Sequence, residues 1–202
     1  MSKVQQPFMP GNPASESRDS ARFKFRDNGL GFSPITIALH WMIAVLVLSI
    51  IALKVLHSID PALGSPRYVN LFGAVLFPIS IYRFWSRITS WHPLPVGTPN
   101  PIEVIVSRSV AVALALAMVL LPIAAWLTKS CGGQAIELPG GLVVPALLGV
   151  HPDAVHAFDV LFDIGAGAFL CGLALHMFGA FKNHFVLKND SLKRMLGKHV
   201  EL

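Results

Sequence analysis

The apolar run at residues 160–181 constrains the fold of this chain more than any other stretch. About 20 predominantly apolar residues are what an α-helix needs to cross the hydrocarbon core of a bilayer, and this run has that length. It carries His176 near its far end. An imidazole at that depth is costly unless it has a partner, so an intramembrane histidine marks a functional site. The run therefore predicts a spanning helix and raises the question of what His176 binds.

Three further apolar runs indicate that the whole chain is a membrane protein. Hydrophobic residues make up 53% of the sequence and charged residues only 13%, whereas globular proteins carry roughly 25% charge. Spanning helices are expected at about 33–56, 68–86, 104–127 and 159–181. We therefore predict an all-α fold, a transmembrane four-helix bundle within 33–187. A flexible basic arm at 1–32 would precede it and a cytoplasmic tail at 188–202 would follow it.

The distribution of positive charge predicts the topology. Of the 16 Lys and Arg residues, all but Lys54, Arg67 and Lys129 lie in the N-terminal arm, the 83–108 region or the tail. Because positive residues favour the cytoplasmic side, both termini are expected in the cytoplasm. The basic residues flank apolar runs, which argues against nucleic acid as the partner. The two cysteines are far apart and predict no disulfide framework.

Two histidines lie inside apolar runs, out of eight in the chain. His40 is about six residues into the first run and His176 about five from the end of the last, so the 1.5 Å rise per residue puts both near the same depth. Two imidazoles facing each other across neighbouring helices are the usual arrangement for a b-type haem. The alternative is that each histidine hydrogen-bonds to a neighbouring helix. Glycines along the last run would let a macrocycle or another helix approach closely: Gly165, Gly167, Gly172 and Gly179.

Several motifs resemble those of a known family. They are Leu39-His40-Trp41, Gly73 with Arg83 ten residues on, Pro122, Leu175-His176 with His184, and the stretch at 190–196. Over about 34–196 the chain resembles the bacterial cytochrome b561 family, four-helix membrane proteins with two haems. The resemblance implies haem b, electron transport in a respiratory chain, and a multi-pass protein of the bacterial inner membrane. It also implies that His40 and His176 are the axial ligands of the iron on the cytoplasmic side.

The resemblance has one gap. The family's other haem uses a histidine four residues before the helix-2 glycine and one fourteen before the late helix-4 histidine, and these positions are Val69 and Phe162 here. Neither side chain can bind iron, so we predict one haem. Arg83 is a candidate for pairing with a haem propionate, because a guanidinium suits a carboxylate. The alternative for Arg83 is a charge that only sets topology.

A single haem leaves two interpretations of function open. In the first, the chain is an electron-transfer component that exchanges electrons with quinone or a partner redox protein in the bilayer. In the second, it is a degenerate accessory or structural subunit of a larger respiratory or photosynthetic membrane complex. No catalytic residue is predicted in either. A transporter is disfavoured, because the runs lack the paired broken helices of a transport path.

Overall fold

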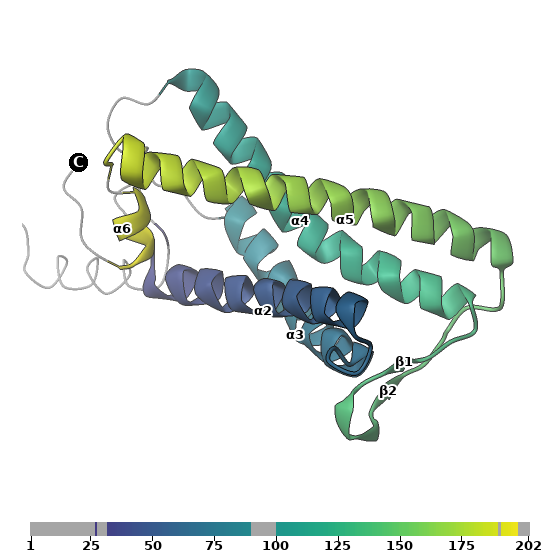
Figure 1. Ribbon diagram of the computed structural model, residues 1–202. Coiled ribbons are helices and arrows are strands. Elements are labelled where there is room, and N and C mark those ends of the chain that lie inside the picture. Colours follow the sequence, from purple (N-terminus) through teal and green to yellow (C-terminus); the bar gives the residue numbers. More distant parts are fainter. Residues whose placement is uncertain (1–26, 28–31, 90–99, 190, 198–202) are drawn as a thin grey trace, which may run out of the picture.

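The computed structural model describes residues 27, 32–89, 100–189 and 191–197, and its path is shown in Figure 1. Four long helices stand out among these residues: α2 (Pro34–Ile59), α3 (Pro66–Thr89), α4 (Pro101–Cys131) and α5 (Pro152–Phe181). A single π-helical turn, η2 (Lys182–Val186), and the short helix α6 (Ser191–Met195) follow α5. Most of the predicted arm at 1–32 lies outside the described residues, as do 198–202.

Each long helix begins at a proline, which suits the first helical turn because its missing N–H would have no partner there. Ser33 caps α2, as its sequence predicts: its Oγ accepts a hydrogen bond from the Thr36 N–H at 3.1 Å. Asn100 caps α4 in the same way, accepting from the Ile102 N–H. α5 begins at Pro152, earlier than the expected 159. Its first two turns differ from the sequence expectation because His151-Pro152 is also typical of a turn, and the sequence favours a loop before 159.

Three of the described helices are long and apolar enough to cross a membrane: Pro34–Ile59, Pro101–Cys131 and the continuous Pro152–Val186. α3 has 24 residues, a sufficient length, but it is more polar and does not belong to that group. The chain is thus a mostly helical membrane protein. Because few side chains in these spans are buried within the molecule, their apolar surfaces face outward, as lipid contact requires.

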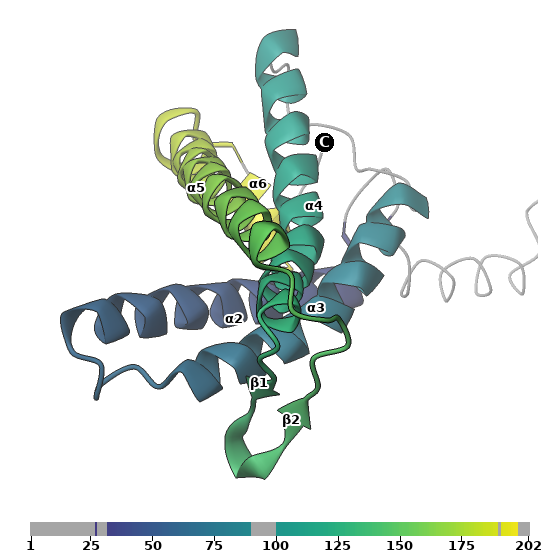
Figure 2. The same cartoon turned by 90° about the vertical axis from the view of Figure 1, so that its right-hand side faces the viewer.

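Each long helix packs mainly against the helix that precedes or follows it in the sequence. α4 lies along α5, α2 packs against α3, and α3 packs against α4 (Figures 1 and 2). Ile43, Val47 and Leu76 form a small core between α2 and α3, and Phe169 of α5 is among the side chains that reach it. Within the described part, the backbones of α2 and α5 approach each other far less than those of the packed pairs.

Two of the four glycines on α5 serve helix–helix packing. A Cβ at Gly165 would lie 3.1 Å from Leu121 Cδ2 of α4, and one at Gly172 would lie 3.3 Å from Leu114 Cδ2. These glycines let α4 approach closely, which is one of the two roles expected for them. The positions of Gly167 and Gly179 have no described atom within 4 Å of an added Cβ.

A β-hairpin departs from the all-α prediction. It connects α4 to α5 and consists of β1 (Ile136–Glu137), the 3₁₀ turn η1 (Pro139–Gly141) and β2 (Val143–Val144). The strands are antiparallel, with Ile136 opposite Val144. Such short strands give no alternating pattern long enough to predict them from sequence, and the turn residues at about 128–157 favour a long loop.

Candidate functional site

His40 and His176 meet although their helices do not pack closely. The ring centroids are 6.2 Å apart and the ring planes are tilted by 58°. His40 lies in the second turn of α2, and His176 lies in the last two turns of α5. The side chains therefore bridge two helices whose backbones stay apart. We call this end of the molecule, where α2 begins and α5 ends, the histidine end.

The spacing of the two rings fits a shared metal centre. Two imidazoles that each bind one metal through a nitrogen at about 2 Å have ring centroids roughly 6 Å apart. Among the described residues, no group of three or more His, Cys, Asp and Glu could hold a bare metal ion. Two axial nitrogens are what a haem iron takes from the protein, since the macrocycle supplies the remaining ligands. The residues present fit a haem better than an isolated ion.

Trp41 ties His40 to the C-terminal segment. Its ring meets that of His40 edge-on, at 5.8 Å between centroids and 81° between planes. The Trp41 Nε1–H donates a hydrogen bond to the Met195 carbonyl at 2.9 Å. Arg194 of the same segment is buried. The last described residues thus contact the start of α2, and one hydrogen bond links Trp41 to them.

Arginines surround the histidine pair. Arg83 of α3 lies close enough to His40 to interact with it electrostatically, and Arg87 lies close enough to His176. Arg87 also faces the charges of Arg83 and Arg108. We call Arg83, Arg87 and Arg108 the arginine cluster. The carboxylate of Asp27 lies close enough to Arg83 and Arg87 to offset part of this charge, and a guanidinium can also bind a further carboxylate.

Arg87 is a candidate site residue that the sequence analysis does not identify. Its Nε is buried and has no hydrogen-bond partner among the described residues. A buried donor of this kind needs an acceptor, and a propionate beside the histidines would supply one. The available signal was spacing: Arg87 follows Arg83 by four residues, so both lie on one face of α3.

Away from the histidine end, a different pair of side chains lies between α2 and α5. The ammonium of Lys54 on α2 lies 5.6 Å from the centroid of the Phe162 ring on α5, a cation–π distance. Val69 is in the first turns of α3 and is half-buried. The two positions that the resemblance singles out for a second haem are therefore occupied by side chains that cannot bind iron.

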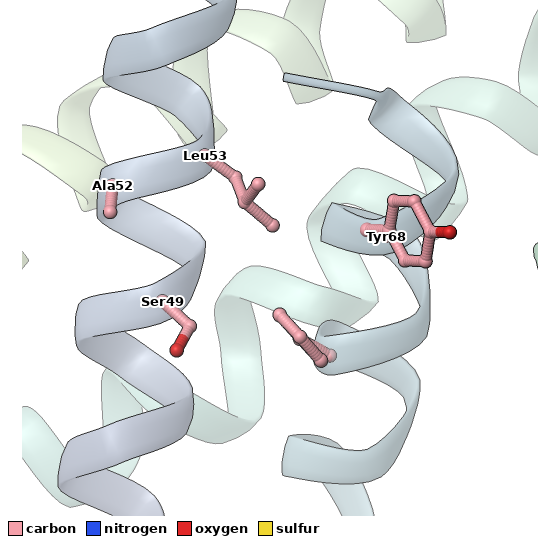
Figure 3. Close-up of a pocket in the computed structure, with 5 residues that line it drawn as sticks. Ser49, Ala52, Leu53 and Tyr68 are labelled. Carbon is pink, nitrogen blue, oxygen red and sulfur yellow. The ribbon is translucent and has the colours of Figure 1, made fainter. Parts of the chain in front are cut away.

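A shallow groove of about 300 Å³ lies between α2 and α3 (Figure 3). It is lined by Ser49, Ala52, Leu53, Tyr68 and Phe72. Ser49 follows His40 by nine residues, more than two helical turns. The groove is thus separate from the histidine pair and adds no ligand to it.

Comparison with known proteins shows the family of the chain. Residues 31–198 match the sequence model of the prokaryotic cytochrome b561 family. The chain is also 29% identical over 175 residues to cytochrome b561 homolog 2 of Escherichia coli (strain K12), an alignment that covers 83% of this chain and 92% of that protein. The family match spans all four long helices and both histidines, so the chain belongs to the prokaryotic cytochrome b561 family of membrane b-type cytochromes that act in electron transfer.

Proposed function

We propose that this chain is a one-haem b-type cytochrome of the bacterial inner membrane that exchanges electrons with quinone or with a partner redox protein. The observation that carries the proposal is the 6.2 Å spacing of the His40 and His176 rings. A haem bound there supplies one-electron transfer, because its iron can be ferric or ferrous. The side chains of the site hold, orient and shield that group.

Each residue of the site has a distinct part. His40 and His176 would hold the haem, each supplying one neutral nitrogen to its iron. Trp41 fixes the ring of His40, since it contacts that ring and is itself held by the Met195 carbonyl. Arg83 and Arg87 would pair with the propionates, and this would supply the acceptor that the buried Arg87 Nε lacks among the described residues.

We propose further that α3 is a fourth span and that both termini are cytoplasmic. The length of α3 supports the first point, at 24 residues. The contact between Trp41 and Met195 supports the second, because it brings the start of α2 and the last described segment to the same end. The arginine cluster lies at that end too, as the preference of positive charge for the cytoplasmic side predicts.

The position of the site limits where the electrons go. The histidine pair lies near one face of a hydrocarbon core that is about 30 Å thick. With one haem, most of that thickness has no redox centre. Donor and acceptor therefore both reach the protein at the histidine end, or a partner supplies the missing centre within the membrane.

A redox difference spectrum tests the proposal. We expect purified protein to give the sharp α and Soret bands of a six-coordinate b-type haem when dithionite-reduced and air-oxidised spectra are subtracted. Reduced protein should not bind carbon monoxide readily, because both axial positions are taken by imidazoles. A protein purified with haem synthesis intact that shows no such bands would contradict the proposal.

Neutralising the arginines should lower the reduction potential. In Arg83→Gln or Arg87→Gln, loss of a nearby positive charge stabilises the ferric form, which is one charge more positive than the ferrous form. A change of about 1.4 kcal/mol corresponds to about 60 mV for one electron, and we expect a downward shift of that order in a spectroscopic titration. Arg67→Gln is the matched control, because Arg67 is at the other end of α3 and pairs with Glu137. Equal reduction potentials in all variants would show that Arg83 and Arg87 do not lie beside the haem.

A further inference from the structure

The connection between α4 and α5 is a defined structural element rather than a loose loop. Residues 136–150, here called the apolar hairpin, contain the two paired strands and a tip closed by a hydrogen bond from the Leu138 N–H to the Leu142 carbonyl at 2.8 Å. Gly140 and Gly141 both have φ of 78°, a conformation that other residues rarely adopt. The sequence thus builds a tight turn at this point.

Both ends of the apolar hairpin are fixed to the helices. Glu137 forms an ion pair with Arg67 of α3 at 2.8 Å, and its carbonyl accepts a hydrogen bond from Asn70 Nδ2 at 3.0 Å. On the other side, Ser130 Oγ at the end of α4 accepts hydrogen bonds from the Leu147 and Leu148 N–H groups. Figures 1 and 2 show the hairpin projecting between the end of α4 and the start of α5, beside the start of α3.

The fixed hairpin presents a strongly apolar surface. Glu137 is the one charged residue in 136–150, and the ion pair with Arg67 neutralises it. Leu142 is 65% exposed and Leu147 72% exposed. Val143, Leu148 and Val150 are exposed as well. An exposed cluster of apolar side chains of this kind marks a surface that contacts a protein or a membrane.

Lipid is the occupant that the surroundings favour. The apolar hairpin directly joins α4 and α5, two helices whose outward apolar surfaces make them candidate membrane spans. Its exposed side chains therefore continue a surface that already faces lipid. A docking site for a soluble protein would carry a polar rim and charges to select its partner, and the single charge of the hairpin is already paired.

We propose that the apolar hairpin lies in the bilayer interface on the face opposite the histidine end, with Leu142 and Leu147 inserted at the boundary between headgroups and acyl chains. Its depth follows from the backbone. Strands of two residues leave other N–H and C=O groups of the hairpin to be hydrated, and such groups do not enter the hydrocarbon core exposed to lipid. Interfacial elements bury their apolar side chains about 5–10 Å deep, a depth that keeps the backbone near water.

Spin-label accessibility tests this placement. Leu142→Cys and Leu147→Cys are made in a Cys171→Ala background, where the remaining Cys131 is buried. The full chain is labelled and reconstituted in phosphatidylcholine vesicles, and collisions with oxygen and with a water-soluble nickel complex are measured. Asp153→Cys, at the exposed start of α5, is the reference for water. Leu170→Cys, in the exposed middle of α5, is the reference for hydrocarbon.

The expected ratio of oxygen to nickel accessibility at 142 and 147 lies between the two references, with nickel collisions several-fold fewer than at 153. Nickel accessibility equal to that at 153 would place the hairpin in water and overturn the proposal. A ratio equal to that at 170 would contradict the interfacial depth. Low accessibility to both reagents would show a contact with a second copy of the chain instead of lipid. Circular dichroism of each labelled variant establishes that the helices are intact.

Discussion

Replacing His40 or His176 by alanine is expected to remove nearly all haem from the purified protein. The two rings stand 6.2 Å apart on different helices, so in the proposed site each would supply one nitrogen to the iron that the other could not replace. Loss of an outer-shell partner already costs metal sites roughly 10–100-fold in affinity, and loss of a ligand should cost more. The measurement is haem absorbance per milligram of protein after purification from membranes.

The control for this experiment is His156→Ala. His156 is on α5 as well, but in its first two turns and exposed, so its variant should keep its full haem content. Free imidazole added to the His176→Ala protein should restore part of the six-coordinate spectrum, which separates ligand loss from misfolding. Full haem retention in both ligand variants would refute the assigned pair.

The histidine pair was predictable because it depends only on depth along helices. Counting residues from the ends of two apolar runs places His40 and His176 at the same level, and the rings do lie side by side. The depth of a residue along a helix does not determine, however, which way its side chain points around the helix axis. The contact between Trp41 and the Met195 carbonyl joins residues 154 positions apart and left no trace in the local sequence.

The structure differs from the sequence expectation in the apolar hairpin, which tertiary contacts stabilise, and in the start of α5. The apolar hairpin is fixed by Arg67 and by Ser130 from two different helices, while its strands are too short for a sequence pattern. The early start of α5 had a local signal, Pro152 followed by Asp153 in the first turn, since proline and acidic residues favour helix N-termini. α3 is polar in part because it carries Arg83 and Arg87. Both arginines are visible in the sequence, but they share one face only because this segment is helical.

The purified protein is expected to contain one haem per chain, where a member of the family with both ligand pairs would contain two. The physical reason lies between α2 and α5 beyond the histidine pair. There the Lys54 ammonium lies 5.6 Å from the centroid of the Phe162 ring, and Phe162 stands where the resemblance expects a second histidine of the last helix. Val69 on α3 offers no nitrogen either.

A pyridine haemochrome assay normalised to quantitative amino-acid analysis measures this ratio directly. A redox titration of the same sample provides an independent reading, because one haem gives a single one-electron transition and two haems in different surroundings give two. The His176→Ala variant sharpens the result: with a single site, its haem content should fall towards zero rather than to half. A ratio near two haems per chain would show a second haem held by other residues. So would a His176→Ala variant that keeps half of the haem content. The assignment of one redox centre near one membrane face would then be wrong, and the protein could carry electrons across the bilayer by itself.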